Sequence, residues 1–172
     1  PLTLVKTMTS HSRNLVTYKS QVDKLNAIRR GEIKEGLSLG IDTIDEYWRF
    51  KFNSFNIVLG HASTGKTTTL LYLLLLYALK YDLKFLIFSA ENEASSISKK
   101  LVEFLTGLPF HKIDEKTWLE KLKWVDKHFK YIDIDNVYTA GELLAEAAQI
   151  KKDYDYHSLM IDPYNSLLRD KE

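Results

Sequence analysis

Apolar and polar residues alternate along the chain in patterns that predict helices and strands in turn. Residues 18–28 place apolar side chains at helical spacing, at Tyr18, Val22, Leu25 and Ile28. We therefore expect an amphipathic helix here, on an otherwise polar background. Its apolar stripe needs a partner surface, which belongs either to the same domain or to a neighbouring subunit.

The pattern changes towards buried elements further along the chain. A short helix is expected over residues 41–48, and the β-favouring run Phe55–Leu59 predicts a strand. Residues 67–80 are apolar nearly all round, as in a helix that lies between a sheet and other elements. The continuous apolar run at residues 84–89 predicts a strand buried on both faces. This alternation favours an α/β fold with a mainly parallel sheet flanked by helices.

The last third of the chain continues the alternation. The expected elements are a helix over 94–105, a helix opened by a capping box at Thr117 and Glu120, a short edge strand over 131–135, a helix from a second capping box at Thr139 and Glu142 to about residue 152, and a strand over 158–162 that ends in an acid. Pro163 prevents that strand from continuing.

Composition narrows the class of protein. The 172 residues (20.0 kDa) suit one domain with a substantial core. A net charge of +1 gives no global basic field, so any DNA contact must be local. The absence of cysteine excludes disulfides and cysteine-ligated metals.

The longest apolar run, residues 70–79, is about half of the ~20 residues that a membrane helix needs, so we expect no membrane partner. We expect a soluble, intracellular protein, in the cytoplasm, a phage-infected cell or an organelle matrix. Because the chain opens at Pro1, it is expected to be a processed product or a fragment.

One segment carries recognisable chemistry. Between Gly60 and Thr67 the chain has a glycine, four residues, and then Gly-Lys-Thr, which is the phosphate-loop pattern. Glycines allow backbone N–H groups to converge on an anion, and the following helix adds its positive end. Lys66 can reach terminal phosphates and the Thr67 hydroxyl can bind Mg²⁺. We therefore expect ATP or another nucleoside triphosphate and Mg²⁺ as cofactors. The candidate nucleotide-binding residues are Gly60, His61, Ala62, Ser63, Thr64, Gly65, Lys66, Thr67 and Thr68.

Two acids follow predicted strands. Asp162 ends an apolar strand, as the second Mg²⁺-organising acid of such sites (the Walker B acid) does; alternatively it caps a helix or a turn. Glu91 follows the run at residues 84–89 directly; alternatively it is a first-turn acid of the next helix. Carboxyl ends of parallel strands share one edge of a sheet, so Glu91, Asp162 and Lys66 are expected to meet.

With these residues the chain resembles the RecA-like ATPase domain of the DnaB/Twinkle replicative helicase family, and most closely the Twinkle-like branch with its phage relatives. The resemblance spans about residues 36–168. It depends on the phosphate loop together with four further runs: Gly-Ile-Asp-Thr-Ile-Asp (40–45), Phe-Ser-Ala-Glu-Asn (88–92), Thr-Gly-Leu-Pro-Phe (106–110) and Ile-Asp-Pro-Tyr-Asn (161–165). At Asn53 and Ser54 the chain departs from relatives, which often carry glycine there.

The resemblance implies roles for individual residues. Lys66 and Thr67 would bind phosphate and Mg²⁺, Asp162 would be the Walker B acid, binding Mg²⁺ directly or through a water, and Glu91 would be the catalytic carboxylate beside Lys66. Family members form hexameric rings that hydrolyse nucleoside triphosphates and translocate on single-stranded DNA. Residues 1–35 would be the linker, whose helix at 18–28 reaches the next subunit, and residues 36–172 the first part of the ATPase core.

The resemblance also implies what this chain would lack. A strand between those that carry the phosphate loop and the Walker B acid, the main DNA-contacting segments and the arginine finger all follow the Walker B acid in the family, beyond residue 172. The 172-residue chain alone is therefore expected to be inactive.

Three other readings of the sequence remain. A different RecA-like ATPase, of the recombinase or clock type, would not be expected to carry the run at 161–165. A small-molecule kinase is disfavoured because residues 90–168 contain no arginine for a mobile lid. A non-catalytic module that holds a nucleotide for oligomerisation is the reading from a different class, and turnover stimulated by single-stranded DNA separates it from the enzymes.

Overall fold

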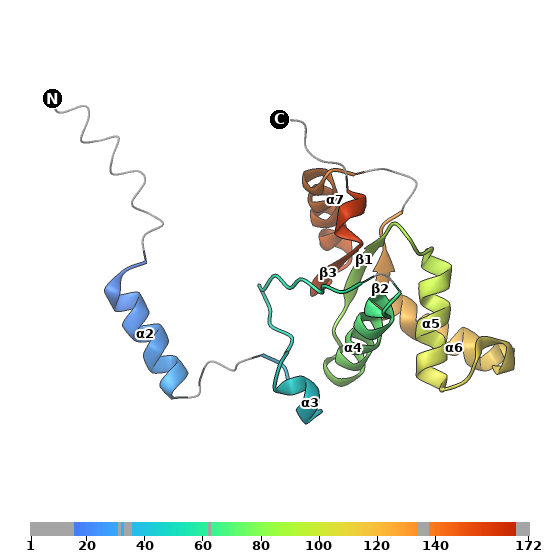
Figure 1. The fold of residues 1–172 in the computed structure, drawn as a ribbon, viewed down its shortest axis with the longest axis horizontal. Coiled ribbons are helices and arrows are strands. Elements are labelled where there is room, and N and C mark those ends of the chain that lie inside the picture. Colours follow the sequence, from blue (N-terminus) through green and yellow to red (C-terminus); the bar gives the residue numbers. More distant parts are fainter. Residues whose placement is uncertain (1–15, 31, 33–35, 62, 134–137, 168–172) are drawn as a thin grey trace.

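The computed structural model describes residues 16–30, 32, 36–61, 63–133 and 138–167. Within them the chain forms an α/β fold with an open, all-parallel sheet of three strands (Figure 1). The strand order is β2-β1-β3, with β1 at Phe85–Ser89, β2 at Phe129–Tyr131 and β3 at Ser158–Asp162. The expectation of a parallel sheet flanked by helices is confirmed. The expected edge strand at 131–135 is wrong in position, since β2 begins and ends earlier; residues 134 and 135 lie outside the described residues.

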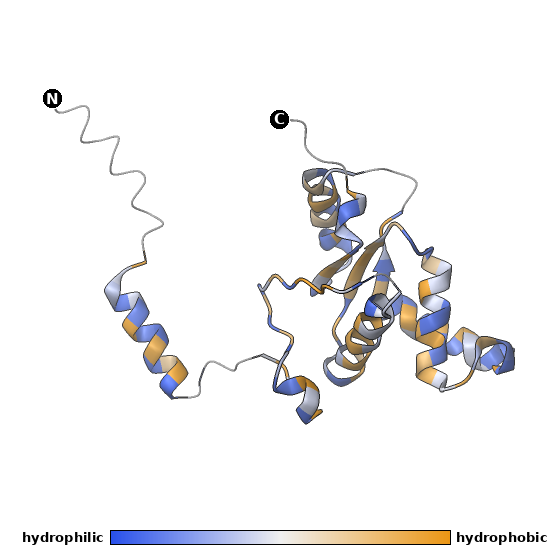
Figure 2. Ribbon diagram, viewed as in Figure 1, coloured by the Kyte–Doolittle hydropathy of each residue, from blue (hydrophilic) through white to orange (hydrophobic). Residues whose placement is uncertain are grey.

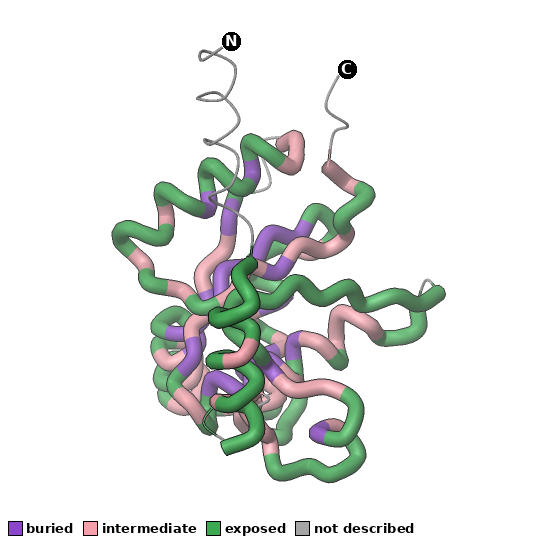
Figure 3. The backbone as a smooth tube through the Cα atoms, turned by 90° about the vertical axis from the view of Figure 1, so that its left-hand side faces the viewer, coloured by how far each residue is buried: buried purple, intermediate pink, exposed green. Residues whose placement is uncertain are grey.

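Helices cover both faces of the sheet. One face packs against α4 (Lys66–Tyr81), α5 (Ala94–Thr106) and α6 (Glu115–His128), and the other against α7 (Ala140–Asp153). Figure 2 shows the apolar residues concentrated in the strands and on α4, and Figure 3 shows the buried residues in the same part of the molecule. No helix among the described residues is long and apolar enough to cross a membrane.

The central strand explains why there are two cores. Successive side chains of a strand point to opposite faces of its sheet. Phe85 and Ile87 accordingly belong to the larger core with α4, α5 and α6, whereas Leu86 and Phe88 belong to the smaller core with α7. All five residues of β1 are buried, as its continuous apolar sequence predicts for a strand covered on both faces.

Local capping chemistry sets where the helices begin. Thr139 caps α7 in the predicted box, since its hydroxyl accepts from the backbone N–H of Glu142 at 3.2 Å and the Glu142 carboxylate accepts from the backbone N–H of Thr139 at 2.8 Å. The box predicted at Thr117 and Glu120 is wrong. Instead, α6 begins earlier because the Asp114 carboxylate accepts from the backbone N–H of Thr117 at 3.0 Å.

The N-terminal helix is separate from this body. α2 (Tyr18–Arg29) confirms the helix expected over 18–28 and lies apart from the sheet (Figure 1). It has no buried residue, and Tyr18 is 83% exposed. Packing of its apolar stripe on its own domain is therefore not seen among the described residues. The next helix, α3 (Asp42–Asp45), is shorter than the expected 41–48.

Polar contacts attach the segment around α3 to α4. Leu37 and Phe50 form an isolated antiparallel bridge, and the Tyr77 hydroxyl joins both residues. This hydroxyl donates to the Leu37 carbonyl oxygen at 3.0 Å and accepts from the Phe50 N–H at 3.1 Å. Tyr81 donates to the Ser38 carbonyl oxygen at 2.5 Å. Hydrogen bonds to Tyr77 and Tyr81 of α4 thus attach residues 36–50 to the packed part of the molecule.

A single buried carboxylate organises the loop before α3. Asp45 accepts from the Ser38 hydroxyl at 2.6 Å and from the N–H groups of Leu39, Gly40 and Ile41 at 2.8, 2.7 and 3.2 Å. These hydrogen bonds, led by the one from Ser38, lower the pKa of Asp45 to about 2 because they stabilise its charged form.

The strand predicted at Phe55–Leu59 is wrong. The segment has no strand partner among the described residues, and its side chains are exposed, with Phe55 at 84% and Leu59 at 87%. The prediction failed because the apolar run supplies strand propensity but no neighbouring strand with which to pair. β3 correspondingly has β1 on one side and no described strand on the other.

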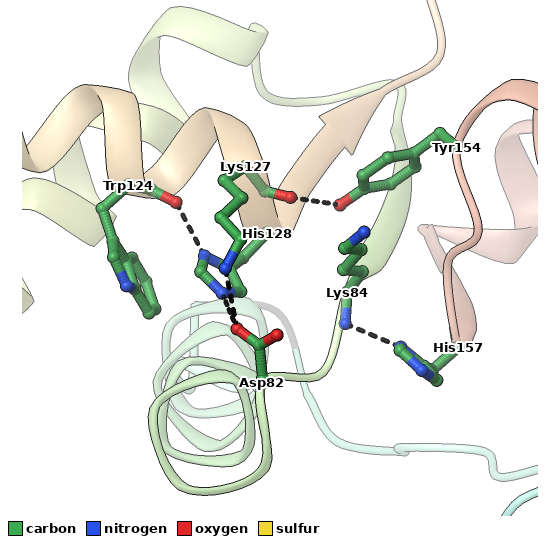
Figure 4. Close-up of polar contacts among 7 residues, drawn as sticks. All are labelled: Asp82, Lys84, Trp124, Lys127, His128, Tyr154 and His157. Atoms are coloured by element: carbon green, nitrogen blue, oxygen red, sulfur yellow. Dashed lines mark hydrogen bonds and ion pairs between the residues drawn. The ribbon is translucent and has the colours of Figure 1, made fainter.

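A buried histidine joins two helix ends near the start of β1 and β2 (Figure 4). His128 is 1% exposed; its Nε2 lies 2.8 Å from Oδ1 of Asp82, and its Nδ1 lies 2.8 Å from the Trp124 carbonyl oxygen. Lys127 also bonds to Asp82, at 3.0 Å. The carbonyl oxygen and the carboxylate can only accept, so each of these hydrogen bonds needs a ring N–H of His128 as its donor.

Candidate functional site

The phosphate-loop residues, 60–67, connect the exposed segment at residues 55–59 to helix α4. Gly65 is the residue before α4 and has a φ of +82°, a conformation that side chains other than glycine rarely adopt. Gly60 was expected to serve in the same way, but it is not among the positive-φ residues, and Ser63 has the left-handed conformation instead, with a φ of +59°. A Cβ at Gly60 would lie 3.1 Å from Cδ of Lys66, a close contact that the flexible lysine side chain would have to relieve by shifting.

The loop folds back around the lysine of the pattern. Nζ of Lys66 donates to the carbonyl oxygens of Gly60 and His61, at 2.8 and 2.6 Å. The Thr64 hydroxyl donates to the same His61 carbonyl at 2.9 Å. The ammonium of Lys66 therefore lies inside the turn formed by its own loop, with no described carboxylate paired to it. His61 is exposed, and Ala62 lies outside the described residues.

Two residues far apart in the sequence meet at the start of α4. The Thr67 hydroxyl donates to Oδ2 of Asp162 at 2.8 Å, although 95 residues separate the two. Both residues are half-buried. α4 supplies the hydroxyl from its first turn, and β3 supplies the carboxylate from its last residue. The alternative role of Asp162, as a helix cap, would not account for its hydrogen bond with Thr67.

The second predicted acid lies beyond the same edge of the sheet. Ser89, the last residue of β1, pairs with Asp162 in the strand register, and the N–H of Ala90 bonds to the Asp162 carbonyl oxygen at 3.0 Å. Glu91 follows at the next position and is exposed. It lies before α5 rather than in the first turn of that helix, since Glu93 is the capping residue. The carboxyl ends of β1 and β3 thus bring Glu91 and Asp162 to one edge.

The sequence did not indicate the contact made by a second lysine. Lys100 of α5 donates to the Thr68 hydroxyl at 3.0 Å, and both residues are half-buried. Its place at the margin of the apolar face of α5, next to the buried Leu101, explains the partial burial. Helical spacing indicates that margin, but it does not identify Thr68 as the partner.

The oxygen atoms at the start of α4 suit a hard cation. Mg²⁺ in proteins is usually held by one or two carboxylates together with waters and substrate phosphates, and not by a cage of protein ligands. Thr67 and Asp162 provide one hydroxyl and one carboxylate at 2.8 Å from each other, which fits that pattern. Among the described residues no group of three or more histidine, cysteine, aspartate or glutamate side chains forms a metal cage.

A cavity of about 620 Å³ lies elsewhere, at the carboxyl ends of β1 and β2. Ser89, Asn92, Lys130 and Tyr131 contribute to its lining, and none of the phosphate-loop residues does. Gly60, His61, Ser63, Thr64 and Gly65 of the loop are exposed, whereas Lys66, Thr67 and Thr68 are half-buried. Comparisons of the chain with protein-family models, with curated proteins and with solved structures found no match.

Proposed function

We propose that this chain binds a nucleoside triphosphate with Mg²⁺ at the start of α4 and belongs to an enzyme that hydrolyses it. The observation that carries the proposal is the 2.8 Å contact between Thr67 and Asp162. A phosphate-loop pattern alone occurs by chance, but here its hydroxyl meets an acid at the end of a parallel strand. That is the pairing by which phosphate-loop NTPases hold Mg²⁺.

The remaining residues have separable roles in this proposal. Lys66 exchanges the loop carbonyl oxygens for phosphate oxygens, which bind a cation more strongly because they are charged. Mg²⁺, when bound, neutralises charge on the phosphates. Glu91 accepts a proton from the water whose oxygen attacks the terminal phosphorus, as the bond from that phosphorus to the leaving diphosphate oxygen breaks.

The enzyme that we propose is a ring-forming, DnaB/Twinkle-like replicative DNA helicase, of which this chain is part of the ATPase domain. The support is the set of sequence runs that accompany the phosphate loop and the exposed apolar stripe of α2. We propose that this stripe packs on the next copy of the chain in a ring, and that single-stranded DNA contacts lie mainly beyond residue 172. Leu25→Asp is expected to dissociate the ring in analytical ultracentrifugation; an unchanged sedimentation coefficient would contradict this role of α2.

Nucleotide binding is tested by removing the loop cation. In the full-length protein, Lys66→Ala is expected to abolish ATP binding, measured by isothermal titration calorimetry, without unfolding the domain, since Lys66 has no place in the apolar core. Lys80→Ala, an exposed lysine in the last turn of the same helix, is the matched control. Unchanged ATP affinity in folded Lys66→Ala would overturn the proposal.

Hydrolysis is tested at the second acid. Glu91→Gln keeps the shape of the side chain but cannot accept the proton, so we expect ATP binding to persist and turnover to fall about 10²–10⁴-fold. Glu93→Gln, two residues further on and also exposed, is the control. Asp162→Asn is expected to weaken Mg²⁺ dependence instead. If Glu91→Gln turns over ATP at the wild-type rate, another group accepts the proton from water. If the wild-type protein shows no turnover with single-stranded DNA, the result favours the non-catalytic module.

A further inference from the structure

Lys100 is paired differently from four other lysines of the packed body. Lys121, Lys127, Lys130 and Lys151 each form an ion pair with a carboxylate. Lys100 is half-buried, yet within the described residues its ammonium meets only the Thr68 hydroxyl, at 3.0 Å, and no carboxylate. Partial burial of a cation without a counter-charge is unfavourable. The position is therefore suited to an anion that arrives with a ligand.

The place of Lys100 gives the identity of that anion. Thr67 and Thr68 are neighbours in the first turn of α4, so their side chains leave the helix about 100° apart. On one side Thr67 meets Asp162 of β3, and on the other Thr68 meets Lys100 of α5. The start of α4 thus has an acidic flank, suited to a metal ion, and a cationic flank, suited to phosphate.

We propose that Lys100 is a second phosphate-binding cation of the nucleotide site, positioned by Thr68. The proposal rests on the proposed function, because it assigns a further ligand to the same triphosphate. An ammonium has three N–H donors, so the bond to Thr68 leaves two for phosphate oxygens. The Thr68 hydroxyl accepts from Lys100 and donates to no described residue, which leaves its own hydrogen for the phosphate as well.

A purely structural tie between α4 and α5 is the competing explanation. Both helices already contribute to the larger apolar core, through Leu71 and Leu75 of α4 and Ile97 and Leu101 of α5. One hydrogen bond from a half-exposed lysine adds little to that packing. The two explanations differ in what removal of the charge changes: ATP affinity if Lys100 binds phosphate, and only the stability of the ligand-free protein if it is a tie.

The test compares two adjacent lysines in the full-length protein. Lys100→Met is expected to raise the Kd for ATP·Mg²⁺ about tenfold, as for the loss of a charge-assisted hydrogen bond, and Lys100→Arg to retain most of the affinity. Lys99→Met removes the exposed neighbour on α5 and is expected to change the Kd less than twofold. Wild-type affinity in Lys100→Met would overturn the proposal, and so would equal losses in Lys99→Met and Lys100→Met.

Two further measurements separate failure of this proposal from failure of the nucleotide site. If Lys66→Ala abolishes ATP binding while Lys100→Met does not weaken it, the nucleotide site is supported and the role of Lys100 is contradicted. If Lys66→Ala leaves ATP binding unchanged, the proposed function itself is contradicted. Positioning by Thr68 predicts that Thr68→Val and Lys100→Met together weaken ATP binding by less than the product of their separate effects. If the Kd of the double variant rises by the full product of the two separate fold-changes, Thr68 does not position Lys100.

Discussion

Two apolar runs of the same length and similar composition have opposite fates in this structure. Phe85–Ser89 forms the central strand β1, and every one of its residues is buried. Phe55–Leu59 has equally strong strand-forming residues, yet it lies exposed beside the body without a described partner strand. The difference is pairing: β1 has a parallel neighbour on each side, whereas the other segment has none among the described residues.

The comparison shows that strand propensity describes fitness for a sheet and not an independent preference of the backbone. β1 buries one set of side chains against α4, α5 and α6 and the alternate set against α7. No element in the described part of the chain covers residues 55–59 in this way, and their side chains are exposed. A contiguous run of exposed apolar residues on an extended backbone is a surface that favours association.

Truncation of one phenylalanine in each run gives the largest expected effect. Phe85 is 0% exposed and stacks on Phe129, so Phe85→Ala is expected to lower the free energy of unfolding by about 3–5 kcal/mol. Phe55→Ala is expected to lower it by less than about 0.5 kcal/mol, as for an exposed side chain. Urea titrations of both variants measure the difference. Equal losses would break the comparison, because they would show that residues 55–59 are packed in solution.

The sequence predicted most of the packed region because local and tertiary preferences agree there. The helix over 67–80, the strand over 84–89 and the capping box at Thr139 were expected and are found, each at most a residue or two from its expected bounds. The α6 start was missed because Asp114 is a capping residue three positions before the box at Thr117, and both patterns fit the letters of the sequence. The strand predicted at 55–59 is not found, because pairing with a neighbouring strand is not a local property of the sequence.

The candidate site was predictable to a similar degree. Spacing singled out the loop and both acids as candidates, and in the structure the Thr67 hydroxyl meets Asp162. The folding of the loop onto Lys66 and the contact of Lys100 with Thr68 depend on how α4 and α5 pack, which no spacing in the sequence encodes. The buried Asp45 was likewise noticed only as part of a run, and not as the acceptor of four hydrogen bonds.

Asp45 gives the next prediction, since it lies in the part of the N-terminal segment that is attached to the body. Its pKa of about 2 is lower than the value near 3.9 of an unfolded chain, so the unfolded state binds more protons between these two pH values. The stability from Asp45 is therefore complete above about pH 5 and is lost as the pH falls towards 2. We expect Asp45→Asn to be less stable than the wild type at pH 7, and nearly equal to it at pH 2.

The measurement is urea unfolding of both proteins at pH 7, 4 and 3. We expect the difference in unfolding free energy between the wild type and Asp45→Asn to narrow steadily as the pH falls. Protonation removes the negative charge of Asp45 from the wild type, and the substitution removes that charge at every pH. A gap of constant size would contradict the assignment to the Asp45 charge. Asp42→Asn, in the same short helix but exposed, is the matched control and is expected to leave no gap.

The smallest effect is expected at Asp82, within the packed region. Its hydrogen bonds, first to His128 and then to Lys127, lower its pKa to about 2, so the sign is the same: stability is present above about pH 5 and is lost as the pH falls towards 2. The carboxylate is mostly exposed, so water competes for its hydrogen bonds, and Asp82→Asn is expected to destabilise the protein less than Asp45→Asn does. Asp155→Asn, which breaks an exposed pair with Lys151, is the control and is expected to have no effect. The ring of His128 is buried, so its contact with Asp82 is shielded from ions in solution, and the effect of Asp82→Asn should persist in 1 M NaCl. Its disappearance in salt would show that the contact between Asp82 and His128 is an ordinary surface pair, and that the packed region depends on its apolar cores alone.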